Sequence, residues 1–201
     1  MPRRTDDAPR PSQRAAVLKA AMEVMAEKGP EKTRVQDIAA RAGMSAGHVM
    51  YYFGKRDRIL VDTLLESEAD AAVQRDRRVG SAADPREALE RVVRLYLPTG
   101  SSDLRWKLWA QLVARPPQDP ETLSAYAGVL DGWTASLAGA IEAGVADGVF
   151  TCADPATTAY RACRLMDGYA LEVLLGTPGR TRAWAVSSVL AALDDELAPR
   201  A

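Results

Sequence analysis

The residues with the clearest potential for chemistry lie in one segment near the N-terminus, and they carry a ring nitrogen, hydroxyls or positive charges: His48, Tyr51, Tyr52, Lys55 and Arg56. Hydroxyls and cations at the ends of a helix are groups that bind phosphate. Two small residues, Ala46 and Gly47, precede the segment and would let a helix backbone approach a groove closely. These residue types favour contact with a nucleic acid.

Two short helices would position these groups. The first would be capped by Thr33 and has apolar residues at i, i+3, i+4 and i+7: Val35, Ile38, Ala39 and Ala42. Gly43 would open a three-residue turn, and Ser45 would cap a second helix through Phe53. A helix, a short glycine turn and a helix are typical of a helix-turn-helix motif. Short helical hairpins also occur in bundles that bind no DNA, so that alternative stays open.

The charge distribution agrees with a DNA-binding N-terminal part. The 201 residues carry a net charge of −1, but residues 1–58 hold 12 basic and 7 acidic side chains, whereas residues 59–201 hold 14 basic and 20 acidic ones. A basic N-terminal part attracts phosphates, and an acidic remainder avoids them.

The remaining sequence is helical in pattern, with almost no β-type alternation, and we expect an all-α protein. Residues 1–11 are expected to form a flexible basic arm, residues 12–55 a three-helix DNA-binding domain, and residues 56–201 a six-helix domain for ligand binding and dimerisation. The first helix would start after Ser12, and the six later helices would cover about 56–78, 85–97, 102–115, 120–147, 155–175 and 180–197. In the longest helix, an apolar stripe from Leu123 to Ile141 is expected to be buried.

Several classes of function are disfavoured. His48 is the only histidine, and Cys152 and Cys163 lack the spacing of a metal site, so we expect no metal, no cofactor and no catalysis. The sequence shows neither a signal peptide nor a membrane-spanning run, and a cytoplasmic location without a membrane partner is expected.

Aromatic and acidic residues of the C-terminal part are candidates for a ligand site: Trp106, Trp109, Tyr126, Trp133, Tyr160 and Asp167. Four Trp and six Tyr against two Phe mean that most rings carry a polar edge, which suits a cavity better than a dry core. Together with Asp131 and Glu142, the rings favour an aromatic or cationic ligand. The alternative is that these rings are ordinary core residues.

The last two predicted helices suggest self-association. The helix at 155–175 is apolar nearly all round, and the helix at 180–197 has apolar residues at spacings of four and three. We expect these helices to form a homodimer interface through Leu171, Leu175, Val186, Leu190 and Leu193.

Several stretches of the sequence resemble a known protein family. The stretch from Thr33 to Gly47, followed by Tyr52-Phe53, Lys55-Arg56-Asp57 and Ile59-Leu60, resembles the DNA-binding domain of TetR-family transcriptional regulators. The stretches Leu165–Leu171 and Gly148–Phe150 resemble the regulatory domain of the betaine-responsive repressor subgroup.

The resemblance implies a role for each matching residue. Thr33 and Ser45 would contact phosphate at two helix starts, and Ala46, Gly47 and His48 would face base edges. Tyr51 and Tyr52 would reach the DNA backbone, while Lys55 and Arg56 would hold phosphates. The chain departs from the family at Met50, where Tyr is usual, and Tyr51 would replace that phosphate contact.

The sequence therefore predicts a homodimeric regulator, a repressor that binds a palindromic double-stranded operator and is released by an unidentified small-molecule effector. The subgroup resemblance makes a quaternary ammonium compound one candidate ligand of the C-terminal domain. The two subunits would meet in a two-fold contact between the last two helices. The alternative function is a helical small-molecule carrier or enzyme whose basic N-terminal part is incidental.

Overall fold

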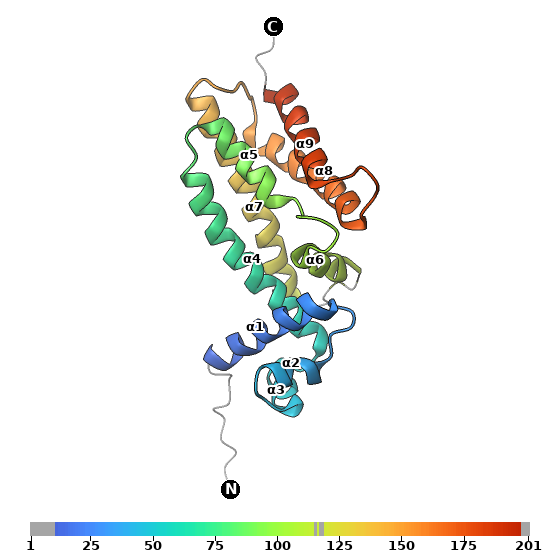
Figure 1. Cartoon of the computed structure of the whole chain (residues 1–201). Helices are drawn as coiled ribbons and strands as arrows, with labels where there is room; N and C mark the ends of the chain where they lie inside the picture. Colours follow the sequence, from blue (N-terminus) through green and yellow to red (C-terminus); the bar gives the residue numbers. More distant parts are fainter. Residues whose placement is uncertain (1–10, 115, 117–118, 198–201) are drawn as a thin grey trace. The chain divides into compact units, whose positions relative to one another are not determined.

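A computed structural model describes residues 11–114, 116 and 119–197. Within these residues the fold is all-α, as predicted, with nine helices (Figure 1). Their bounds are α1 Pro11–Lys28, α2 Val35–Arg41, α3 Ala46–Phe53, α4 Arg56–Gly80, α5 Pro85–Tyr96, α6 Leu104–Ala114, α7 Pro120–Ala146, α8 Pro155–Leu175 and α9 Arg182–Leu197. The expected flexible arm falls almost entirely outside the described residues.

Three helices start as the sequence predicts. At Asp84, Asp119 and Asp154 an aspartate caps the helix and a proline occupies its first turn. Each aspartate side chain accepts a hydrogen bond from the backbone N–H three residues later, at 2.8–3.0 Å. Proline fits there because the first helical N–H groups have no partner inside the helix.

The predicted cap of α2 is wrong by one residue. The N-cap is Arg34, whose backbone N–H donates to the Asp37 carboxylate at 3.3 Å. Thr33 is 2% exposed, and its hydroxyl donates to the carbonyl of Gly29 at 2.8 Å. Thr33 therefore closes the connection between α1 and α2.

The helices divide into two compact units, and each combines two separate stretches of chain. The head comprises Met1–Ser67 with Lys107–Pro117, and the body comprises Glu68–Trp106 with Gln118–Ala201. The predicted domain boundary fell between residues 55 and 56, whereas the units divide the chain within α4 and within α6. The start of α4 joins the head because its apolar side chains Ile59 and Leu64 are fully buried.

The head has an apolar core that α1, α2, α3 and the start of α4 share. Its buried side chains include Val17, Leu18, Val24, Met25, Ile38, Val49, Phe53, Ile59 and Leu64. The second half of α6 lies beside the start of α4, with a water-sized cavity of about 30 Å³ between them. That cavity is lined by Arg56, Asp57, Leu60, Val61, Leu64, Leu108, Gln111 and Leu112.

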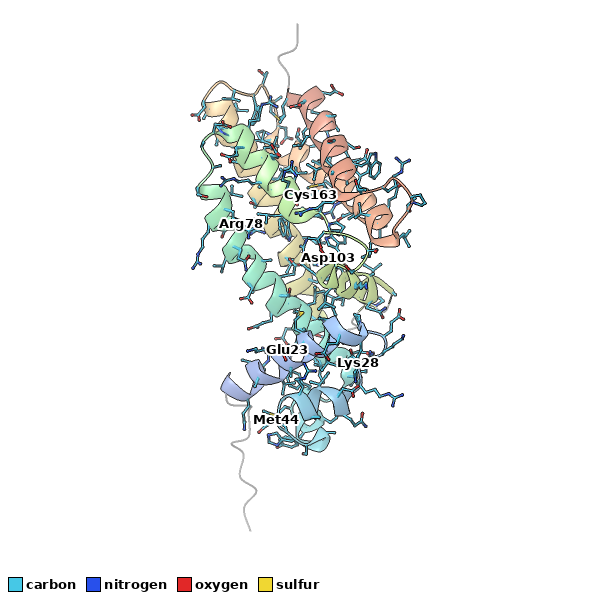
Figure 2. All side chains as sticks on the ribbon, in the orientation of Figure 1. Glu23, Lys28, Met44, Arg78, Asp103 and Cys163 are labelled. Atoms are coloured by element: carbon cyan, nitrogen blue, oxygen red, sulfur yellow. The ribbon has the colours of Figure 1, made fainter. Side chains whose placement is uncertain are left out.

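In the body, four helices form a closed ring, in which α5 packs against α7 and α9, and α8 packs against α7 and α9 (Figure 1). Cys163 lies inside this ring and is fully buried, and burial raises the pKa of its thiol (Figure 2). The apolar stripe of α7 is buried only in its second half, where Trp133, Leu137 and Ile141 lie in the core. Leu123 is 44% exposed, so its predicted burial is wrong for the single chain.

The end of α7 explains the sequence Gly148-Val149-Phe150. After α7 the chain turns back at Gly148, and the ring of Phe150 packs directly on Gly144, where a Cβ atom would overlap it. Phe150 is 4% exposed and belongs to the body core. Gly144 therefore makes room for the ring that closes this end of the body.

Candidate functional site

The turn between α2 and α3 has the geometry of a rigid helix-turn-helix. Gly43 adopts a positive φ of 67°, which favours glycine, and the backbone N–H of Met44 donates to the carbonyl of Ala39 at 2.9 Å. Figure 2 labels Met44 at this turn. Ser45 caps α3 by accepting a hydrogen bond from the backbone N–H of His48 at 3.1 Å.

Ion pairs hold α2 on α1. Arg41 of α2 reaches two carboxylates of α1, Glu27 at 2.8 Å and Glu23 at 3.2 Å, and Lys28 pairs with Asp37 at 2.8 Å. Glu23 and Lys28 are labelled on α1 in Figure 2. The hydrogen bond from Arg41 lowers the pKa of Glu27, and the hydrogen bond from Lys28 lowers the pKa of Asp37. These carboxylates therefore form ion pairs within the head.

α3 separates its buried and exposed residues cleanly. Val49 and Phe53 face the core, whereas Gly47, Met50 and Tyr51 are exposed, and Lys55 is exposed just beyond the helix. Ala46, His48 and Tyr52 are half-buried.

The rings on α3 support one another. The His48 and Tyr52 rings meet edge to face at 4.7 Å, and Tyr51 and Tyr52 do so at 5.4 Å. The structure thus brings six of the predicted DNA-contacting residues onto α3 and the residues that follow it: Ala46, Gly47, His48, Tyr51, Tyr52 and Lys55.

Two residues predicted to contact phosphate, Thr33 and Arg56, make structural hydrogen bonds within the head. The hydroxyl of Thr33 is used by Gly29, as described above. The Arg56 guanidinium donates to the carbonyls of Thr33 at 2.8 Å, Glu31 at 3.4 Å, and Pro30. Arg56 therefore holds the connection between α1 and α2, because an arginine presents several donors in a fixed fork.

Two of the predicted ligand-binding aromatics converge in the body on a ring that was not among the predicted site residues. Tyr96 of α5 meets Trp106 of α6 at 5.8 Å and Trp133 of α7 at 5.2 Å, both edge to face. The hydroxyl of Tyr96 donates to Asp167 of α8 at 2.5 Å. Burial, and then the Asp167 charge, raise the pKa of Tyr96 well above its ordinary value.

The other predicted ligand residues are placed differently. Burial and then the Asp167 charge raise the pKa of Tyr126, which is half-buried. Tyr160 is 56% exposed, with its ring centroid 5.3 Å from the Arg164 guanidinium carbon. Trp109 belongs to the head unit.

Of the three acidic residues expected to favour a cation, only Asp167 lies beside the rings. Asp131 and Glu142 are exposed on α7. Asp167 accepts from Tyr96 and pairs with Arg164 at 3.2 Å. The sequence basis for a cationic ligand is therefore weakened.

Three charged residues of this cluster were not identified from the sequence. The Glu68 carboxylate accepts a hydrogen bond from Trp133 Nε1 at 3.1 Å and pairs with Arg105 at 3.3 Å. The guanidinium carbons of Arg75 and Arg105 lie 4.7 and 5.4 Å from the Trp133 ring centroid. Glu68 and Arg75 are seven residues apart and therefore lie on one side of α4. Charged residues on an otherwise buried side of a helix were the sequence signal that could have identified them.

The predicted interface residues fall into two groups. On α8, Leu171 is 53% and Leu175 80% exposed, and the apolar Leu165 is 38% exposed. On α9, Leu190 is half-buried, but Val186 and Leu193 are 2% and 3% exposed and belong to the core of the body. The regular spacing of α9 serves packing inside the chain, so Val186 and Leu193 offer no surface to a partner.

The described residues include neither a metal-binding cluster nor a membrane-spanning helix. No group of three or more His, Cys, Asp or Glu side chains there could hold a metal ion. None of the helices in that part of the chain is long and apolar enough to cross a membrane.

Two family models match successive parts of the chain. Residues 17–63 match the family described as bacterial regulatory proteins, tetR family, and residues 85–198 match the C-terminal domain of the BetI-type transcriptional repressors.

Three relatives illustrate the similarity. An HTH-type transcriptional repressor of Mycobacterium tuberculosis is 38% identical over 69 residues, which are 29% of this chain and 37% of the relative. The regulator BetI of Burkholderia cenocepacia is 33% identical over 110 residues, 53% of this chain and 56% of the relative. These matches span roughly a third to just over half of the curated relatives.

The third relative is a solved structure. A transcriptional regulator from Saccharomonospora viridis in complex with choline has a TM-score of 0.82 and 28% identity, covering 95% of this chain and 100% of the other. The family matches together cover most of the described chain. The chain belongs to the TetR family of bacterial regulatory proteins, with a C-terminal domain of the BetI repressor type, and is a transcriptional regulator and not an enzyme.

Proposed function

We propose that this regulator is a homodimeric repressor that binds an inverted-repeat operator through α3 and leaves it when a small molecule binds the body. The observation that carries the proposal is the exposed side of α3, which Lys55 follows directly after the helix. The capped turn positions the start of α3, and the α1–α2 ion pairs hold the helix before it. A rigid helix with small and polar residues at its start is what the major groove accepts.

The placement of the side chains suggests how they divide the work. Ala46, Gly47 and His48 lie in the first turn of α3 and are proposed to face base edges. Tyr51, Tyr52 and Lys55 follow at its end and are proposed to contact the DNA backbone. Phosphate contacts carry affinity and base contacts carry specificity, so substitutions in the two groups of residues should have different effects on DNA binding.

The test is selection of bound duplexes from a random pool with the full-length protein. We expect an inverted repeat, because a two-fold dimer requires a two-fold site. With roughly 6–10 phosphate contacts, affinity should fall steeply with salt, with a log–log slope of about −0.9 per contact. An asymmetric consensus or salt-independent binding would contradict the proposal.

His48→Ala provides the test of base reading. The half-buried ring lies beside Tyr52 at the start of α3, so its loss should change the preferred bases within each half-site. If His48→Ala lowers affinity equally for every sequence in the selected pool, His48 is not a base-reading residue.

The proposed dimer forms through α8 and α9. Leu165, Leu171 and Leu175 give α8 an exposed apolar side, on which Gly168 is also exposed. Ala183, Ser187 and Ala191 recur every four residues on the exposed side of α9, where small side chains permit close approach of another helix. Large exposed apolar patches are rare on monomers, which supports a partner surface here.

The proposed effector site is the cluster around Trp133, Tyr96 and Trp106 in the body. Its support is the gathering of three aromatic rings with buried polar groups, together with the choline complex of the similar Saccharomonospora viridis regulator. An effector releases DNA only if it binds the DNA-incompetent state more tightly. The test is whether a compound that quenches tryptophan fluorescence also lowers operator affinity, and whether operator DNA lowers the affinity for that compound by the same factor.

A further inference from the structure

Arg75 is a buried arginine whose charge the body does not fully pair. It lies on α4 in the body unit, its side chain is 9% exposed, and its guanidinium carbon is 4.7 Å from the centroid of the Trp133 ring. Gly132 of α7 is also beside it, since a Cβ atom at Gly132 would be 3.9 Å from Arg75 Nη2. The guanidinium therefore lies against the segment of α7 that carries Trp133.

The hydrogen bonds of Arg75 leave two donor groups unused. Its Nε contacts the carboxylate of Asp76 at 3.4 Å, and that carboxylate is 71% exposed. Within the part of the chain that the structure describes, neither Nη1 nor Nη2 of Arg75 has a hydrogen-bond partner. The exposed Asp76 carboxylate neutralises the buried Arg75 guanidinium only in part, and a guanidinium with free terminal nitrogens is suited to binding a carboxylate or phosphate.

Arg105 provides the internal comparison. It also lies over Trp133, with its guanidinium carbon 5.4 Å from the ring centroid, but its two terminal nitrogens are occupied. Nη1 pairs with Glu68, and Nη2 donates to the carbonyls of Leu95 and Tyr96. The Arg105 guanidinium thus stabilises the fold, whereas Nη1 and Nη2 of Arg75 remain available to a ligand.

The charges in direct contact with the Trp133 ring are mainly positive, and Asp167, which lies one ring further at Tyr96, is paired with Arg164. Two guanidiniums, those of Arg75 and Arg105, lie near one indole, and one buried carboxylate, that of Glu68, accompanies them. The aromatic face that a ligand cation would use is already near two cations of the protein itself. A further cation would be repelled, and an anion would be attracted.

We infer that the effector of this regulator carries an oxyanion, a carboxylate in the first instance, and that Nη1 and Nη2 of Arg75 bind it beside Trp133. This inference rests on the proposed function, which places the effector in the same cluster. The two terminal nitrogens of a guanidinium match the two oxygens of a carboxylate. The ligand would then differ in charge from the choline bound by the similar Saccharomonospora viridis regulator.

The experiment compares probes that share a skeleton and differ in charge: phenylacetate, phenylacetamide and phenethylammonium. Binding to the full-length protein without DNA is measured by calorimetry and by thermal shift, alongside a series of alkyl carboxylates, phenyl phosphate and choline. Phenylacetate or an alkyl carboxylate should bind with a Kd of about 1 mM or tighter and about tenfold better than its neutral and cationic counterparts. Preference for phenyl phosphate over the carboxylates would support an oxyanion site but overturn the assignment of a carboxylate as the ligand.

Arg75→Met is the matched variant, because it keeps an unbranched apolar side chain beside Trp133 and removes the charge. It should weaken carboxylate binding by about tenfold and abolish the preference for the anion. Arg78→Met is the control on the same helix, since Arg78 is exposed, and it should change binding less than about twofold (Figure 2). Arg75→Lys keeps the charge without the fork and should lie between the wild type and Arg75→Met.

The wild-type protein alone can overturn the inference. Equal or tighter binding of phenethylammonium or choline, or no response to any carboxylate or to phenyl phosphate, would contradict it whether or not the Arg75 variants fold. An unchanged anion preference in folded Arg75→Met would remove Arg75 from the site. A carboxylate that binds through Arg75 without changing operator affinity would support the anion site and contradict effector-driven release. Failure of the anion site can therefore be distinguished from failure of the proposed function.

Discussion

Lys55 and Arg56 are adjacent cations with opposite environments: Lys55 is exposed beyond the end of α3, and Arg56 donates to backbone carbonyls of the α1–α2 connection. A phosphate can reach the first more readily than the second. We therefore propose that Lys55 serves DNA binding, whereas Arg56 serves the fold.

The first prediction concerns this pair. Lys55→Ala should lower affinity for all DNA sequences alike and reduce the salt slope by about one phosphate contact, without changing the melting temperature. Arg56→Ala should lower the free energy of unfolding by about 1–3 kcal/mol, because it removes charged hydrogen bonds to the carbonyls of Thr33 and Glu31. Salt-dependent binding titrations and thermal unfolding measure the two effects. The reverse pattern would exchange the two roles.

The second prediction concerns association. Leu171→Glu should convert the proposed dimer into a monomer with weak operator binding, because a carboxylate would be buried in an apolar contact. Val73→Glu on α4 is the matched control, since Val73 is 52% and Leu171 53% exposed in the single chain. Sedimentation velocity reports the mass of both. A dimeric Leu171→Glu variant would move the interface away from this side of α8.

Leu193→Glu is not a suitable test of the same interface. Leu193 is 3% exposed inside the body core, so a carboxylate there would unfold the subunit irrespective of any partner.

The third prediction concerns the end of α7. Gly144→Ala should destabilise the body by about 1–3 kcal/mol, because the new methyl group would overlap the buried Phe150 ring. Gly139→Ala is the control on the same helix: Gly139 is exposed, nothing lies within 4 Å of its would-be Cβ, and alanine should stabilise the helix by about 0.5–1 kcal/mol. Chemical denaturation would measure both changes. Equal effects would show that Phe150 moves aside freely.

The fourth prediction concerns alkaline pH. Burial and Asp167 raise the pKa of Tyr96 above its ordinary value of 10.0, so the folded protein keeps this proton when the unfolded chain loses it. The stabilising contribution is complete below pH 10 and is lost progressively as pH rises above it. Tyr96→Phe should therefore have a shallower loss of stability than the wild type above that pH. Identical slopes in denaturation curves would contradict a buried, protonated Tyr96.

Local sequence signals predicted the helices well because their ends depend on neighbouring residues. Asp84, Asp119 and Asp154, each followed by proline, mark three helix starts, and Gly43 marks the turn before α3. The one-residue error at Thr33 arose because a threonine hydroxyl can also bond backward, to the carbonyl of Gly29.

Long-range pairings could not be predicted in the same way. Periodicity identifies an apolar side of a helix but not what covers it, so Val186 and Leu193 looked like interface residues and are core residues. Trp133 was found by its type, but its partners Glu68 and Arg105 lie 65 and 28 positions away in sequence. Only the packing of α4, α6 and α7 in the body brings these three together.

The division of α4 and α6 between head and body bears on how the DNA-reading part can be transplanted. A gene fusion cut between residues 55 and 56 would discard Ile59 and Leu64, which complete the head's own core. A cut after Ser67 keeps them but loses Leu108 and Leu112, which line the same cavity as Leu60 and Leu64. We therefore expect a chimeric regulator to keep the stability of the head only if it inherits the second half of α6 along with the N-terminal helices.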